Sequence, residues 1–228
     1  PILIISIPQP PQSTQGNNKK GVIFELKEGF NLLKEFKGLF FLFFYLSITF
    51  TLAAPAWRFL PLLVTEHLLG DEVLLGAITS AFGIGSIVGG SLLGIWGGSR
   101  KRIKTTILAR FGSGICYLVL GLIPSGNFIL PVLACASFGI TFSISLGSQR
   151  AVLLAVVPSR FQGRIFSLFG WSQAVLQPLG FAIFGFFGEL SGIAAMFLFS
   201  GSILIGCAVF MRLTPALMAI EDTVIEKD

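Results

Sequence analysis

The stretch from Leu75 to Lys104, LGAITSAFGIGSIVGGSLLGIWGGSRKRIK, decides the fold of this chain. No residue between Glu72 and Arg100 is charged, and this run is longer than the roughly 20 residues that an α-helix needs to cross the hydrocarbon core of a bilayer. The run stops at a cluster of basic residues: Arg100, Lys101, Arg102 and Lys104. Because basic loops stay on the cytoplasmic side, the stretch predicts a membrane span with a cytoplasmic end.

Small residues recur four apart on this helix and form two ridges. One ridge contains Ala77, Ala81, Gly85 and Gly89, and the other contains Ser86, Gly90, Gly94 and Gly98. Glycine is costly in a helix unless another backbone approaches it closely, so the ridges predict tight helix neighbours in lipid. We expect packing contacts at Ala81, Gly85, Gly89 and Gly90, and we favour packing over contact between these glycines and a solute.

The composition indicates a polytopic membrane protein. Hydrophobic residues make up 54% of the 228 residues, charged residues only 12%, and the mean hydropathy is +0.86. A soluble domain of this size could not cover its surface with polar groups. The net charge of +5 therefore reflects loop topology rather than nucleic-acid binding. Three cysteines inside apolar runs, without CxxC spacing, indicate neither a disulfide framework nor a metal site, and no cofactor is expected.

Breaks at charges, proline and glycine divide the chain into three regions. We expect residues 1–37 to contain the end of a preceding transmembrane helix, a proline-rich cytoplasmic linker and an amphipathic interfacial helix. Residues 38–213 form a six-helix transmembrane domain, and residues 214–228 form a cytoplasmic tail. The predicted spans are 38–63, 73–97, 105–123, 128–157, 165–188 and 193–213, with a tight hairpin at 124–127.

The basic residues predict the orientation of these spans. If the chain begins in the cytoplasm, only Arg58 of the 16 Lys and Arg residues falls near the outer side. Both ends of the chain are therefore expected in the cytoplasm of a multi-pass plasma-membrane protein. The first outer loop holds the only histidine, His67, which we interpret as a solvated loop residue rather than a metal ligand or proton sensor.

Polar side chains inside spans predict which helices line a water-filled pathway, because hydrocarbon does not solvate them. Three spans have such faces, whereas the third and sixth spans carry only scattered polar residues and are expected to face lipid. The candidate cavity residues are Ser47, Thr51, Trp57 and Arg58 on the first span, Ser137, Thr141, Ser145 and Gln149 on the fourth, and Trp171, Gln173 and Gln177 on the fifth. The alternative for each polar stripe is a set of interhelical hydrogen bonds.

Arg58 is the one charged residue that we interpret as lying well inside a span. Its position near the outer end allows either interfacial anchoring or a role in a cavity or gate. Pro55 and Pro178 are expected to kink their helices.

The order of spans, the loop GIWGGSRKRIK and the segment VVPSRFQGRIFSLFG together resemble the C-terminal half of a major facilitator superfamily transporter. The resemblance is to the drug-efflux branch, which includes macrolide exporters and an enterobactin exporter. The first loop is similar to the family's G-x-x-x-D-R-x-G-R-K signature in a degenerate copy. Gly94 matches its first glycine and Arg100, Lys101 and Arg102 its basic tail, while Gly98 stands in place of the aspartate. Pro158, Gly163 and Arg164 resemble the equivalent loop of the next repeat.

This resemblance implies an all-α half-transporter built from two inverted three-helix repeats, with solute bound between it and an absent N-terminal six-helix half. The residues matched to the signature would act at a cytoplasmic gate and set topology. The first and fourth helices would line the cavity.

We therefore expect a secondary active exporter of a small amphipathic compound, such as a drug or siderophore, that works by alternating access in the lipid bilayer. The alternatives are a membrane scaffold or half-size dimerising protein, and an uptake permease of the same family. An enzyme is not expected, because no span contains His, Asp or Glu for catalysis. The substrate, the coupling ion and the direction of transport remain open at this stage.

Overall fold

Six long helices make up most of the computed structural model, which describes residues 37–99 and 101–218. They are α2 (Lys37–Arg58), α4 (Glu72–Trp96), α5 (Arg102–Leu122), α6 (Ile129–Val156), α7 (Ser159–Ser191) and α8 (Ile193–Leu213). All six are long and apolar enough to cross a membrane, and the described ranges contain no strand. The predicted fold class, an all-α polytopic membrane protein, is confirmed.

Three short elements complete the described chain: α3 (Leu60–Leu62), the π-helical turn η1 (Leu63–His67) and α9 (Pro215–Met218). The first predicted span is thus divided, because α2 contains Pro55 and stops at Arg58 before α3 continues the path. The linker and interfacial helix predicted within residues 1–36 lie outside the described residues. The same holds for Arg100 and for the tail from residue 219 onward.

Local signals explain where the helices begin and end. The carboxylate of Asp71 accepts a hydrogen bond from the backbone N–H of Leu74 at 3.0 Å and caps α4. The same helix stops at Gly97, whose φ of +74° is the left-handed conformation that glycine adopts without strain. In the predicted hairpin, Gly126 has a φ of +82° and donates its N–H to the carbonyl of Leu68 at 3.1 Å.

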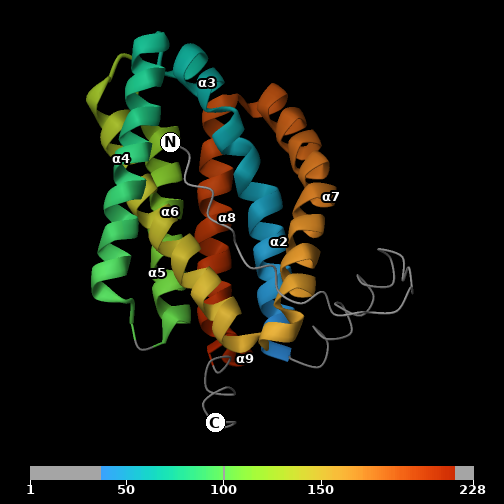
Figure 1. Ribbon diagram of the computed structural model, residues 1–228. Coiled ribbons are helices and arrows are strands. Elements are labelled where there is room, and N and C mark those ends of the chain that lie inside the picture. Colours follow the sequence, from blue (N-terminus) through green and yellow to red (C-terminus); the bar gives the residue numbers. More distant parts are fainter. Residues whose placement is uncertain (1–36, 100, 219–228) are drawn as a thin grey trace, which may run out of the picture.

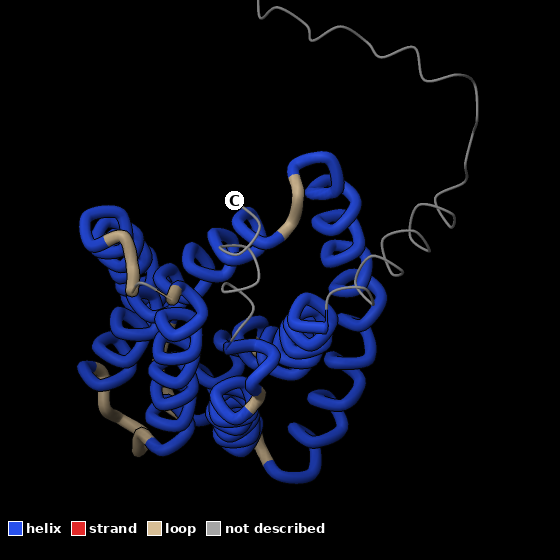
Figure 2. The backbone as a smooth tube through the Cα atoms, turned by 90° about the horizontal axis from the view of Figure 1, so that it is seen from below, coloured by secondary structure: helices blue, strands red, loops and turns tan. Residues whose placement is uncertain are grey.

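The helices pack in a pattern that relates the first three long helices to the last three. Helix α6 packs against α4 and α5, while α2 packs against α7 and α8, and α5 meets α8. Figure 1 shows α4 and α7 on opposite sides of the bundle, and Figure 2 shows the same bundle along its axis. Two three-helix repeats that exchange their first helices give this pattern of contacts.

The two ends of the bundle differ in charge. Lys101 immediately precedes α5, and Arg102 and Lys104 lie in its first turn; we name this the basic end. The opposite, acidic end carries all the carboxylates of the described residues: Glu66, Asp71, Glu72 and Glu189.

Glycines let α4 and α6 approach closely, but only along one of the two predicted ridges. Gly85 and Gly89 are buried, and a Cβ on either would overlap the backbone of α6 at Ala136 or Ile140. Ala81 on the same ridge is also buried. Gly90 corrects the prediction, since it is exposed and an added Cβ would meet nothing within 4 Å. Of the second ridge, Gly90 and Gly94 therefore lie on an open face of this chain, whereas Ser86 packs against Gly139 of α6.

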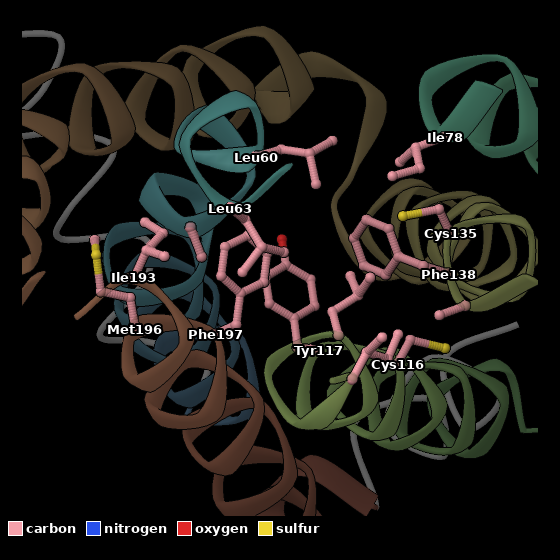
Figure 3. Close-up of a cluster of buried hydrophobic side chains, with 14 of the residues drawn as sticks. Leu60, Leu63, Ile78, Cys116, Tyr117, Cys135, Phe138, Ile193, Met196 and Phe197 are labelled. Atoms are coloured by element: carbon pink, nitrogen blue, oxygen red, sulfur yellow. The ribbon is translucent and has the colours of Figure 1, made fainter. Parts of the chain in front are cut away.

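Helix α5 also departs from its predicted position facing lipid. Together with α2 it is among the most covered spans, whereas α4 and α7 are the least covered. Small residues explain this placement, because Gly114 and Gly121 bring α5 against the backbone of α8. Figure 3 shows Tyr117 of α5 between Phe197 of α8 and Phe138 of α6, in the centre of the hydrophobic core.

Candidate functional site

A pocket of about 280 Å³ lies within the bundle, between α2 and the helices that face it. Helix α2 supplies one wall, with Thr49, Phe50, Ala53, Ala54, Trp57 and Arg58. The remaining wall comes from α4, α5, α6, α7 and α8. Because both three-helix repeats contribute, a solute held here would contact helices that move relative to one another if the repeats rearrange.

Aromatic rings from α2, α4, α5 and α6 line the pocket. The ring centroid of Trp57 lies 4.5 Å from that of Phe82 on α4 and 5.2 Å from that of Phe138 on α6. Phe142 continues the cluster 5.7 Å from Phe138, and Tyr117 of α5 meets Phe138 edge-on at 4.9 Å. Such a surface binds the apolar body of a ligand through its large contact area and its quadrupoles.

Polar groups are few and lie at defined points of the wall. Arg110 and Ser113 come from α5, Thr49 from α2 and Gln177 from α7. Arg110 donates through Nη2 to Oε1 of Gln149 at 3.1 Å, and Ser113 donates to Oγ1 of Thr141 at 3.0 Å. A mostly apolar pocket with a few placed polar groups is the usual form of a small-molecule site.

Three of the candidate cavity residues line this pocket: Trp57, Arg58 and Gln177. Arg58 is exposed and near the acidic end, where α2 stops. Its position therefore combines the two predicted alternatives, because the same side chain lies near the interface and forms part of the pocket rim.

Ser47 and Thr51 occupy a different face of α2. The Ser47 hydroxyl lies 3.2 Å from that of Ser172 on α7, and the Thr51 hydroxyl donates to the carbonyl of Ser47 at 2.7 Å. Both are buried between α2 and α7. Neither residue lines this pocket, and the alternative of interhelical hydrogen bonding fits Ser47. Their place in a cavity shared with another half stays a prediction. The threonine of α2 that lines the pocket is Thr49, which lies two residues after Ser47 and two before Thr51.

The polar stripe of α6 lies behind the pocket rather than in its wall. Thr141 and Gln149 bond to Ser113 and Arg110 of α5, as described above, and so support two residues of the wall. Ser145 is buried, and its hydroxyl has no hydrogen-bond partner among the described residues. Ser137 is exposed. The helix presents Phe138 and Phe142 to this pocket instead, and the predicted lining of a cavity shared with another half stays a prediction.

Trp171 and Gln173 of α7 are absent from the pocket wall. Trp171 is 51% exposed, and Gln173 is half-buried. Gln177 lies one turn beyond Gln173 and does reach the wall. Two residue types therefore occur both inside and outside the pocket wall. Trp57 and Gln177 line the pocket, whereas Trp171 and Gln173 do not.

Apart from Arg100, which lies outside the described residues, the predicted gate residues lie at the basic end. Arg102 begins α5 and its Nη1 donates to the carbonyl of Ala151 on α6 at 3.4 Å. Gly98 has a φ of +80°, whereas Gly94 and Gly163 have open space where a side chain would be. Pro158 precedes the first turn of α7, which carries Gly163 and Arg164 in its early turns. Lys101 precedes α5 as its N-terminal flanking residue.

Sequence reasoning missed Arg110, Thr49, Tyr117 and the phenylalanines of the wall. Arg110 was counted only as an inner-side positive charge. It lies eight residues beyond the start of α5 at Arg102, which places it ~12 Å along the helix axis. A charged residue so far into a predicted span is the signal that could have identified it.

His67 bonds to the protein rather than lying free in the outer loop. Its Nε2 donates to the carbonyl of Ile123 at 3.0 Å, which ties η1 to the end of α5. Among residues 37–99 and 101–218, no three His, Cys, Asp or Glu side chains are grouped so that they could hold a metal ion.

The chain is similar to two bacterial proteins named macrolide efflux protein A. It is 30% identical to that of Streptococcus pyogenes over 187 residues, which cover 82% of this chain and 46% of the relative. It is 29% identical to that of Enterococcus faecalis over 179 residues, which cover 78% of this chain and 55% of the relative. The chain thus spans about half the length of the curated relatives it matches.

No protein-family model and no solved structure matches the chain. The predicted resemblance to the drug-efflux branch is nevertheless confirmed by these relatives together with the six apolar helices. The six apolar helices of the described residues support an integral membrane protein with several spans.

Proposed function

We propose that this chain is the C-terminal six-helix half of a secondary active transporter that exports a small amphipathic compound by alternating access. The aromatic pocket carries the proposal, because its wall combines Trp57, Phe82 and Phe138 with a few polar groups contributed by both repeats. A scaffold protein would not require such a site.

The relatives support the direction and the substrate class. Both are named as macrolide efflux proteins, and macrolides or compounds of similar amphipathic character are the first substrates to test. Since the chain covers about half of each relative, the proposed unit includes an N-terminal six-helix half that faces the pocket from the other side.

The orientation of the bundle follows from its charges. We place the basic end, with Lys101, Arg102 and Lys104, in the cytoplasm and the acidic end outside, so that both ends of the six-helix domain are cytoplasmic. Gly98, Lys101, Arg102, Pro158 and Arg164 would then form the inner mouth. Close approach of this end to the other half would close the pathway on the cytoplasmic side.

No carboxylate lies in the middle of a span of the described chain, so coupling to a proton gradient would need a titratable group at a span end or in the other half. The carboxylates of the described residues lie at the acidic end, at Glu66, Asp71, Glu72 and Glu189. A coupling carboxylate within the membrane would therefore be supplied by the other half.

The test compares two tryptophan variants of the full-length protein that contains this chain. Trp57→Ala removes an aromatic wall of the pocket, whereas Trp171→Ala removes an exposed ring outside it. We expect Trp57→Ala to weaken the apparent affinity for a macrolide by about tenfold, since loss of aromatic contacts of about 1.4 kcal/mol corresponds to that factor. Trp171→Ala should transport like the wild type.

The measurement is efflux of radiolabelled erythromycin from loaded cells at matched membrane abundance of the protein. Wild-type protein that does not lower erythromycin or any amphipathic dye in the cell would contradict the export function. Equal effects of the two tryptophan variants would remove the pocket from the transport path.

A further inference from the structure

The pocket holds a half-buried positive charge that lacks a negative partner in the described chain. Arg110 is half-buried ~12 Å along α5, and guanidinium does not lose its proton in proteins. Its only hydrogen bond from the side chain among the described residues goes to the neutral amide of Gln149. Its Nε is buried without a partner in this part of the chain.

Two neighbouring hydroxyls are also left without partners. Tyr45 and Thr49 of α2 are only 4% and 2% exposed. The Tyr45 hydroxyl lies next to Thr49 and Arg110, yet neither it nor the Thr49 hydroxyl reaches hydrogen-bond geometry with any described residue. The Tyr45 and Thr49 hydroxyls of α2 and the Nε of Arg110 on α5 are therefore neighbouring hydrogen-bond donors that all lack an acceptor among the described residues.

Buried donors without acceptors are energetically unfavourable as long as no ligand supplies an acceptor. A buried donor without an acceptor costs about 1–3 kcal/mol, and an uncompensated charge costs more. The described carboxylates cannot neutralise Arg110, because all of them lie in exposed segments at the acidic end. Within the spans, Glu72 and Glu189 occupy only the terminal turns of α4 and α7 at that end. An arrangement of this kind is complementary to a ligand that brings its own oxygen acceptors.

We infer that Arg110, Thr49 and Tyr45 form a subsite for an anionic or strongly accepting oxygen group, such as a carboxylate, on the transported solute. Arg110 would donate through Nε to that group while Gln149 holds its Nη2. Thr49 lines the same pocket and supplies a second donor. Charge-assisted hydrogen bonds of this type are about twice as strong as neutral ones.

The rest of the pocket then orients the solute. Trp57, Phe82 and Phe138 contact the apolar body, and the acceptor group points toward Arg110. The second arginine of the wall, Arg58, carries the same sign of charge, so this half of the site is positive at both polar points. Next to Arg110 the pocket should therefore prefer an oxygen acceptor, above all an anionic one, over a cationic group, so that a basic macrolide would place its lactone or hydroxyl oxygens rather than its amine there. The biological meaning of this preference rests on the proposed transport function.

Three dansyl compounds test the preference because they share one fluorophore and differ in charge. Dansylglycine carries a carboxylate, dansylglycinamide is neutral and dansylcadaverine is a cation. Binding to the purified full-length protein in detergent is followed by dansyl fluorescence, with displacement by excess unlabelled compound. We expect wild-type protein to bind dansylglycine about tenfold more tightly than dansylcadaverine, which corresponds to about one charge-assisted hydrogen bond.

Arg110→Gln is the decisive variant, and Arg212→Gln is its matched control, because Arg212 is exposed in the last turn of α8 and does not line this pocket. The first should abolish the preference for the acid while dansylglycinamide still binds, and the second should leave the preference in place. Thr49→Val and Tyr45→Phe provide a second route if Arg110→Gln does not fold, because each removes one hydroxyl and keeps nearly the same volume. Each should weaken dansylglycine binding selectively.

The outcomes separate this inference from the transport function. Equal binding of acid and cation by the wild type would overturn the subsite, and would indicate that a carboxylate elsewhere in the full-length protein neutralises Arg110. An acid preference that survives both Arg110→Gln and the hydroxyl variants would overturn it as well. Binding of dansylglycine that depends on Arg110, in a protein that transports no compound, would support the subsite while contradicting the export function.

Discussion

Gly114 of α5 and Gly201 of α8 face each other so closely that a Cβ added to Gly201 would lie 2.8 Å from the carbonyl oxygen of Gly114. The relation is mutual, since a Cβ on Gly114 would lie 3.0 Å from the carbonyl oxygen of Gly201. These two helices hold equivalent places in the two three-helix repeats, α2–α4–α5 and α6–α7–α8. The glycine pair therefore fixes how closely the repeats approach along their shared contact.

This contact predicts a strong effect of one methyl group. Gly201→Ala should destabilise the protein by about 1–3 kcal/mol, because the added carbon meets rigid backbone rather than a movable side chain. Gly206→Ala on the same helix is the control, since a Cβ there meets nothing within 4 Å. Thermal melting of the purified full-length protein in detergent should show a lower midpoint for the first variant only. Equal midpoints would mean that the helices separate at no cost.

The two glutamines of α7 predict different effects on binding. Gln177→Ala should change the affinity for amphipathic ligands, because its amide lies in the pocket wall, whereas Gln173→Ala should not. Loss of one neutral hydrogen bond corresponds to about 0.5–1.5 kcal/mol, or up to about tenfold in the dissociation constant. Fluorescence titration with dansylglycinamide measures both variants. A larger effect at Gln173 would show that the solute binds on another face of α7.

The cap of α4 predicts a local contribution to stability. Asp71→Ala removes the acceptor for the Leu74 N–H and should cost about 1 kcal/mol, while Asp71→Asn keeps an oxygen at that position and should cost less. The melting midpoint should fall in the order wild type, Asn variant, Ala variant. A midpoint unchanged by Asp71→Ala would mean that water replaces the cap fully.

Cysteine labelling tests the proposed orientation. In a protein whose Cys116, Cys135 and Cys207 are replaced by serine or alanine, single cysteines at Ser125 and Gly163 lie on exposed loops or helix ends at opposite ends of the bundle. A membrane-impermeant maleimide should label Ser125→Cys on intact cells and Gly163→Cys only after permeabilisation. The reverse pattern would contradict the cytoplasmic placement of the basic end.

Periodicity and charge were sufficient for the parts of the structure that depend on one helix at a time. The uncharged run that ends at Arg100 could only be a span, because hydrocarbon solvates neither charges nor open backbone groups. The left-handed conformation at Gly97 and the turn at Gly126 followed from glycine in a breaking position. The aromatic Trp57 and the amide Gln177 were also identified from their positions in the spans.

Which face of each helix meets which neighbour was not determined in this way. Thr49 rather than Thr51 faces the pocket, and the difference is a rotation of α2 by two residues that only the contacts with α7 and α8 decide. Gly90 resembles Gly89 in every local respect, yet only Gly89 meets α6.

The sequence by itself determined the apolar spans, their ends and their charge asymmetry, since these depend on the transfer of side chains and backbone from water to lipid. The tertiary structure alone decided that Arg110 of α5 faces a pocket with Tyr45 and Thr49 of α2 beside it. Helices inside lipid are joined by close packing and hydrogen bonds rather than by burial of apolar surface from water, so hydrophobic periodicity carries no record of their partners.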